Sequence, residues 1–107
     1  MLTLLTKQIG GSSVREKDIE QYLRDEVKKV GGRAYKFVSP GNAGVPDRLV
    51  LLPGARAVFV ELKAQEKKST ALQLAQQKRI EKLGFDVLVI DGIHGVDELI
   101  KRYGGDC

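Results

Sequence analysis

The sequence predicts an α/β fold in which a mixed four-stranded sheet is flanked by helices. Hydrophobic residues recur at helical spacing in three segments, and shorter alternating or continuous apolar runs lie between them. The predicted order is helix, three strands, helix, strand, helix. The first three strands are close enough in sequence to pair antiparallel, whereas the helix before the fourth strand implies a parallel, right-handed crossover.

The length and composition of the chain fit a single domain that spans residues 1–107. Hydrophobic residues make up 42% and charged residues 30%, as in folded proteins, and the net charge of +4 weakly favours polyanionic partners. No apolar run is long enough to cross a membrane, and the N-terminus is too short and polar for a signal peptide. The single cysteine, Cys107, cannot form an internal disulfide, so we expect a cytoplasmic protein.

The first helix is predicted after an N-terminal arm, residues 1–11. Ser13 to Glu16 has the form of a capping box, with Ser13 as the N-cap and Glu16 at the third helical position. Gly31-Gly32 ends the helix. Its apolar positions are Ile19, Leu23, Val27 and Val30.

Three strands are predicted next. Arg33–Val38 alternates and carries aromatic residues, and Asp47–Leu52 follows a loop at 39–46 that is dense in Gly and Pro. Pro53-Gly54 forms a turn. Ala57–Lys63 is nearly continuous in its apolar character, which is typical of a central strand.

The second helix opens with another capping box, from Thr70 to Gln73. Gly84 follows its last apolar residue and suits a left-handed C-terminal cap. A fourth strand is predicted at Phe85–Ile90 and a terminal helix at Val96–Tyr103.

Three charged residues stand where a strand is otherwise apolar. Asp47 opens the second strand, and Glu61 and Lys63 lie two apart in the third, so their side chains share one face. One interpretation is a surface ion pair at the exposed end of the strand. The other is a site, because a buried carboxylate is costly unless it is paired or binds a metal.

Two carboxylates that converge from neighbouring strands suit a hard cation such as Mg²⁺. Such a metal would polarise a phosphate and activate a bound water. A lysine beside it can orient or deprotonate that water. Asp47, Glu61 and Lys63 therefore predict metal-dependent phosphodiester hydrolysis.

Pro46-Asp47 followed by Glu61-Leu62-Lys63 resembles the PD-(D/E)XK nuclease superfamily, whose core has the restriction-endonuclease-like order αβββαβ. A closer resemblance is to the VRR-NUC (virus-type replication-repair nuclease) family, in its stand-alone phage and bacterial form. It covers residues 13–91. The segments that carry it are Gly44–Arg48, Phe59–Lys63, Leu72-Gln73 and Leu83-Gly84.

The resemblance implies roles for individual residues. Asp47, Glu61 and the backbone carbonyl of Leu62 would bind Mg²⁺, for which Mn²⁺ could substitute, and Lys63 would serve the hydrolytic water. The family also places a glutamate of its first helix at the metal. Glu16 is preferred here because it starts the helix, although capping alone would explain it, and Glu20 is the alternative.

Several other residues have open interpretations. Gln73 either caps its helix or reaches the catalytic lysine or a metal-bound water. His94 is expected in a turn rather than as a ligand. Ser39, Asn42 and the glycines of 41–44 could let the backbone approach a phosphate. Five basic residues are candidate phosphate contacts: Lys36, Arg48, Lys67, Lys68 and Lys78.

The predicted function is that of a metal-dependent DNA endonuclease. The resemblance implies a homodimer that cuts branched DNA such as four-way junctions, in the host cytoplasm if a phage encodes it. Leu2, Leu4 and Leu5 are candidate interface residues, or part of a frayed leader. The alternatives are a non-catalytic nucleic-acid-binding module with the same fold and an RNA-directed nuclease.

Overall fold

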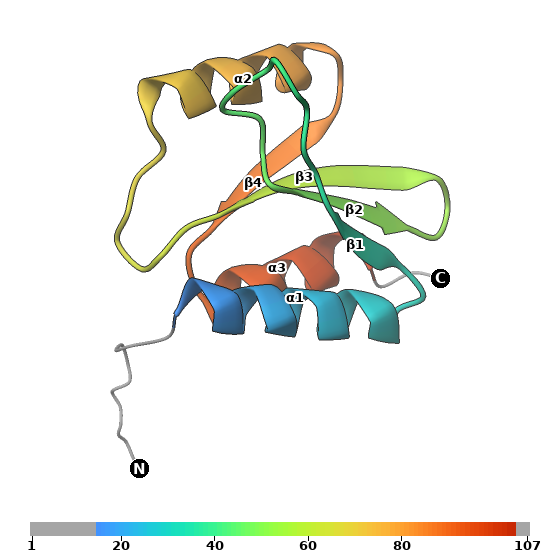
Figure 1. Cartoon of the computed structure of the whole chain (residues 1–107). Coiled ribbons are helices and arrows are strands. Elements are labelled where there is room, and N and C mark those ends of the chain that lie inside the picture. Colours follow the sequence, from blue (N-terminus) through green and yellow to red (C-terminus); the bar gives the residue numbers. More distant parts are fainter. Residues whose placement is uncertain (1–14, 105–107) are drawn as a thin grey trace.

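A computed structural model describes residues 15–104 of the chain. It contains seven elements in that range, in the order predicted from the sequence (Figure 1). They are α1 (Glu16–Lys29), β1 (Arg33–Lys36), β2 (Arg48–Leu52), β3 (Arg56–Leu62), α2 (Ala71–Lys82), β4 (Asp86–Ile90) and α3 (Ile93–Tyr103). No helix of the described part is long and apolar enough to cross a membrane.

The four strands form one sheet in the order β1-β2-β3-β4. β1 pairs antiparallel with β2, and β2 pairs antiparallel with β3. β4 pairs parallel with β3 and places Val89 beside Glu61. The mixed sheet and its parallel crossover are therefore confirmed.

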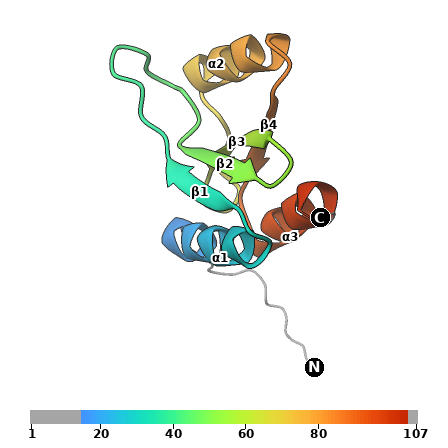
Figure 2. The same cartoon turned by 90° about the vertical axis from the view of Figure 1, so that its right-hand side faces the viewer.

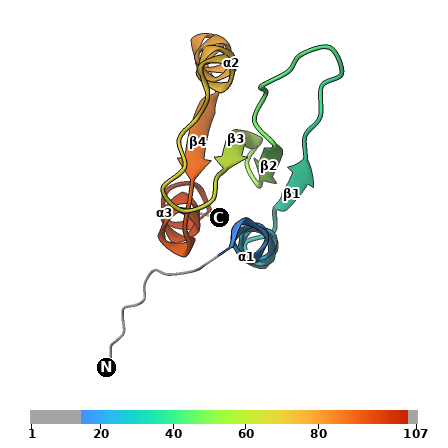
Figure 3. The same ribbon diagram turned by 60° about the vertical axis from the view of Figure 1, so that its left-hand side comes forward.

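Helices lie on both sides of this sheet. In Figure 3, α1 lies beneath β1 and β2, α3 lies beneath β4, and α2 lies above the sheet. We call the side turned toward α1 and α3 the core face. Its side chains make the hydrophobic core with those helices: Ile19, Leu23, Val27, Val50, Leu52, Val58, Val60, Leu62, Ile90, Val96 and Leu99.

The opposite side of the sheet, turned toward α2, is here called the open face. It is less completely covered, because Leu51 and Val89 are 41% and 47% exposed. The only buried residues of α2 are Gln76 and Gln77. The residues that define the open face are Tyr35, Leu49, Leu51, Ala57, Phe59, Glu61, Val87 and Val89.

The segment between β1 and β2 rises from the sheet beside α2 (Figure 2). Gln76 of α2 donates a hydrogen bond from Nε2 to the carbonyl oxygen of Ala43 at 3.1 Å. Gly44 has φ +89°, and a Cβ there would lie 2.8 Å from Leu72 Cγ. A glycine is therefore needed where this loop approaches α2.

Two predicted helix starts were wrong. α1 begins at Glu16 with Arg15 as its N-cap, so Glu16 is the first helical residue and not the third. The Asp18 carboxylate accepts hydrogen bonds from the Arg15 backbone N–H and guanidinium, both at 3.3 Å, which replaces the expected box from Ser13. Ser13, the N-terminal arm, its leucines and Cys107 lie outside the described residues.

α3 begins at Ile93, three residues before the predicted start at Val96. Gly92 is its extended N-cap, so His94 lies in the first helical turn rather than in a loop. The first strand is shorter than the predicted Arg33–Val38, because β1 ends at Lys36. The Phe37 N–H nevertheless donates a hydrogen bond to the Asp47 carbonyl at 2.9 Å.

Candidate active site

Asp47 lies immediately before β2, after the fully buried Pro46. Its Oδ1 accepts a hydrogen bond from the backbone N–H of Leu62 at 2.9 Å. The bond joins the start of β2 to the end of β3 and fixes one oxygen of the carboxylate. Asp47 is thereby held beside the end of β3, which carries Glu61 and is followed by Lys63.

Glu61 is a buried carboxylate on the open face, only 5% exposed. Burial raises its pKa above the ordinary value, and the negative charges of Asp47 and Glu16 raise it further, while Lys63 lowers it. The Lys63 ammonium lies 3.7 Å from Glu61 Oε2. One cation thus only partly offsets the negative charge gathered at Glu61.

Gln73 bridges Glu61 of β3 and Lys63, which directly follows the end of that strand. Its Nε2 donates to Glu61 Oε2 at 3.1 Å, and its Oε1 accepts from Lys63 Nζ at 2.6 Å. The same Oε1 accepts from the Thr70 backbone N–H at 2.9 Å, and the Gln73 N–H donates to Thr70 Oγ1 at 3.1 Å. The capping box of α2 and the contact with the lysine, which the sequence presented as alternatives, are therefore made together.

The two glutamates of α1 have different surroundings. Glu20 Oε2 lies 2.8 Å from Arg24 Nε and 3.6 Å from Arg48 Nε, so its charge is balanced by two guanidinium groups. Glu16 is exposed, and its charge contributes to the raised pKa of Glu61. The charge of Glu16 thus adds to the repulsion at Glu61, whereas Glu20 is held in an ion-pair cluster. Within residues 15–104 no third carboxylate joins Asp47 and Glu61 in a group that could hold a metal ion.

Arg48 does not point toward solvent, as a phosphate contact would. It lies opposite Val60 on the core face, and its side chain is 15% exposed. Its Nη1 donates to the Asp47 carbonyl at 2.8 Å and lies 3.8 Å from Asp47 Oδ2. The alternation of side chains along β2 is the signal that could have identified this inward position from the sequence.

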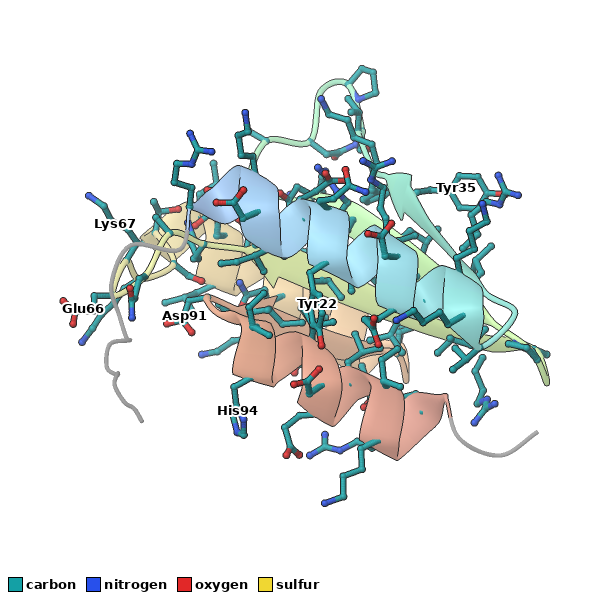
Figure 4. The ribbon with its side chains drawn as sticks, turned by 90° about the horizontal axis from the view of Figure 1, so that it is seen from below. Tyr22, Tyr35, Glu66, Lys67, Asp91 and His94 are labelled. Carbon is teal, nitrogen blue, oxygen red and sulfur yellow. The ribbon has the colours of Figure 1, made fainter. Side chains whose placement is uncertain are left out.

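The other candidates are less closely involved. Asn42 Nδ2 donates to Ser39 Oγ at 2.8 Å, so the two polar loop residues satisfy each other. Lys67, Lys68 and Lys78 are exposed. His94 projects from α3 away from the sheet, while Glu66 and Lys67 lie on the connection after β3 (Figure 4). The structure thus brings together Asp47, Glu61, Lys63 and Gln73, with Glu16 nearby.

These side chains fit a hard cation. Asp47 Oδ1 and Glu61 Oε2 accept protein hydrogen bonds, which leaves Asp47 Oδ2 and Glu61 Oε1 without a hydrogen-bond donor within residues 15–104. No cluster of three or more His, Cys, Asp or Glu side chains forms a metal cage in that range. Mg²⁺ does not require one, because it commonly takes one or two carboxylates and retains several waters.

No family model matches the chain. It is 54% identical over 78 residues to "Putative nuclease p44" of Acyrthosiphon pisum secondary endosymbiont phage 1, a match that covers 73% of this chain and 84% of that protein. A solved structure described as "VRR_NUC domain" superimposes with a TM-score of 0.78 and 33% identity, over 85% of this chain and 99% of the other. A second, "VRR_NUC domain protein", has a TM-score of 0.68 over 87% and 90% of the two chains, and at 20% identity it supports the fold alone.

Proposed function

Because the chain belongs to the VRR-NUC family of nucleases, we propose that it is a Mg²⁺-dependent endonuclease that hydrolyses DNA at Asp47, Glu61 and Lys63. One observation carries the proposal: Glu61 is a buried carboxylate 3.7 Å from a lysine that Gln73 holds in place, and its pKa is raised by burial and then by the charge of Asp47. A cation at this point would relieve that repulsion.

Asp47 Oδ2, Glu61 Oε1 and the Leu62 carbonyl are the atoms that would hold the cation. When bound, Mg²⁺ would activate water and offset the negative charge that develops on the phosphate. The Leu62 N–H fixes Asp47 Oδ1, so Oδ2 would be the oxygen offered to the cation, with Arg48 Nη1 3.8 Å from it. The backbone of Leu62 would then act twice: its N–H orients Asp47, and its carbonyl would bind the cation.

Lys63 would donate hydrogen bonds to the groups that react, the phosphate and the attacking water. Gln73 accepts one of its three ammonium protons at 2.6 Å, which leaves donors for a phosphate oxygen or the attacking water. Its side chain is 14% exposed, so solvent competes little for those protons. Gln73 would act as a positioning residue, because it holds Lys63 and Glu61 at once.

The test is cleavage of supercoiled and linear duplex DNA with Mg²⁺, with Mn²⁺ and with EDTA. Asp47→Asn, Glu61→Gln and Lys63→Met should each abolish cleavage, and EDTA should do the same to the wild type. Lys101→Gln, an exposed change on α3, is the matched control and should cleave normally. Full activity in EDTA, or in Glu61→Gln, would refute the proposed chemistry.

We also propose that the chain acts as a homodimer on branched DNA, which would provide two sites for symmetric incisions. Apolar side chains that are exposed on the open face, on α2 and on the adjoining segments support a second copy as the partner, because exposed apolar surface commonly marks protein interfaces. They include Tyr35, Val38, Leu51, Leu72, Leu74, Leu83, Phe85 and Val89.

Light scattering should then give twice the 11.8 kDa mass of the chain. Four-way junctions should be cut in paired, symmetric positions, faster than linear duplex, flap or single-stranded DNA and faster than RNA of the same sequence. A monomer without junction preference would contradict the dimeric reading and leave the hydrolytic site in place. Binding to DNA without cleavage under any metal condition would favour a non-catalytic module, and faster cleavage of RNA would favour the RNA-directed alternative.

A further inference from the structure

A groove runs between α1 and the outer edge of β1, away from the carboxylates. It has a volume of about 350 Å³ and is lined by Arg24 and Lys28 of α1 and by Gly32–Lys36. Four of its seven lining residues carry a positive charge, and none is acidic. Tyr35 marks this edge in Figure 4, at the end of the sheet away from Glu66 and Lys67.

Three of these cations have no acidic partner in the described part of the chain. Lys28, Arg33 and Lys36 form no ion pair there, whereas Lys29, one residue from Lys28, lies 2.7 Å from Glu26. The Arg33 guanidinium lies 5.9 Å from the Tyr35 ring, which leaves its charge uncompensated. The groove thus concentrates positive charge that the protein does not neutralise.

The backbone of β1 adds donors to the groove. Phe37 N–H bonds to Asp47, so by antiparallel alternation the N–H groups of Ala34 and Lys36 point away from β2, toward the unpaired edge. Amide donors and unpaired cations together suit the phosphates of a nucleic-acid backbone.

Two residues of the groove lining are connected to Arg48, which neighbours Asp47 in the chain. Lys36 pairs across the sheet with Arg48, the residue next to Asp47. Arg24, on the opposite wall, is linked through Glu20 to the same Arg48. From Arg33 to Lys36 the strand spans about 10 Å, which corresponds to about three phosphates along one strand.

We propose that this groove, formed by Lys28, Arg33 and Lys36 on α1 and β1, binds the phosphate backbone of the DNA that flanks the cleaved bond. The proposal rests on the proposed nuclease function, because it assigns the track along which its substrate lies. An ordinary role for lysines on a strand edge is protection against edge-to-edge pairing. That role predicts no effect on DNA binding.

The test compares two double variants that each remove one lysine and one arginine charge. Lys28→Gln/Arg33→Gln changes the groove, and Arg79→Gln/Lys101→Gln changes exposed positions on α2 and α3. Binding of a labelled DNA duplex is measured by fluorescence anisotropy in EDTA over a range of salt concentrations. Thermal unfolding of each variant checks that the fold is retained.

The groove variant should bind roughly tenfold more weakly at about 0.1 M salt, and its plot of log K against log salt should be shallower by about 1.8. The control variant should bind as the wild type does. If DNA binding is weakened equally in the two variants, or is unaffected in both, the proposed role of the groove is refuted. A wild type that neither binds nor cleaves DNA would instead refute the nuclease proposal itself.

Discussion

The two faces of the sheet are built from the same strands but differ in what covers them. The buried apolar side chains of the core face, such as the fully inaccessible Val60, are covered by α1 and α3, in which Leu23 is also fully inaccessible. The open face leaves Leu51 and Val89 partly exposed and buries a charged residue, Glu61. Alternation along β3 assigns Val60 and Glu61 to opposite faces, so one strand contributes to both.

With the proposed active site on the open face, stability and chemistry would be separated across the thickness of one sheet. The helices below hold the fold together through apolar contact. The helix above buries only amide side chains, and Gln73 and Gln76 bond from it to Glu61 and to the Ala43 carbonyl. A substitution on the open face should therefore affect activity more than folding, and a substitution on the core face the reverse.

The largest expected effect is on catalysis. Glu61→Gln should lower the cleavage rate by about a thousandfold or more, because a lost metal ligand removes several kcal/mol of transition-state stabilisation. Its unfolding midpoint without metal at pH 7 should be equal to or above that of the wild type, since the change removes a poorly compensated buried charge. A strong loss of stability would show that Glu61 belongs to the structural framework, and would break the comparison.

The next effect is on stability, in a matched pair of leucines. Leu23→Ala, on the core face, should lower the free energy of unfolding by about 2–5 kcal/mol, as expected for a cavity in a packed core. Leu51→Ala, on the open face and 41% exposed, should cost about 1 kcal/mol or less. Urea denaturation measures both. A cost for Leu51→Ala that grows with protein concentration would indicate that a second copy covers the open face.

A smaller effect separates two neighbouring glutamines of α2. Gln73→Ala should reduce cleavage by about tenfold, which corresponds to about 1.4 kcal/mol, because Lys63 and Glu61 lose their shared partner. Gln77→Ala removes only the bond to Ser69 Oγ and should cost about 1 kcal/mol of stability with normal cleavage. Similar rates in the two variants would mean that Gln73 only caps the helix.

The smallest effect is the pH dependence of stability without metal. The pKa of Glu61 is raised in the folded protein, so the unfolded state loses this proton at lower pH than the folded state does. The contribution of Glu61 to stability is therefore fully present below pH 4.5 and is lost as pH rises through its folded-state pKa. Glu61→Gln should remove this decline; an identical pH profile in wild type and variant would contradict the pKa shift.

The sequence was informative wherever a pattern has a period or a spacing. The strand order, the parallel crossover and the shared face of Glu61 and Lys63 follow from alternation and connection length. The start of α1 was wrong because Asp18 competes with the Ser13 pattern as a capping partner, and local propensity alone does not decide between them. Arg48 was a candidate phosphate contact because of its charge alone, and its inward position in β2 was not considered.

The double role of Gln73 could not be predicted for a different reason. Its cap is a local interaction that four consecutive residues specify, but its bonds to Glu61 and Lys63 depend on how α2 docks over the sheet. The same limit applies to Glu16 and Glu20, whose helical positions are similar, because the contact of Glu20 with Arg48 depends on how α1 packs on β2. The periodicity of a sequence does not show how one element packs against another that is distant in the chain.

The attachment of α2 has a consequence for motion. A helix without a buried apolar side chain belongs to the part of a protein that opens locally at low free energy, well before global unfolding. Each opening of its first turn would release Lys63 from Gln73, so the catalytic geometry would last only as long as that turn. We therefore expect amide hydrogen exchange to be faster in α2 than in α1, and cleavage to decline on warming at temperatures where the core is still folded.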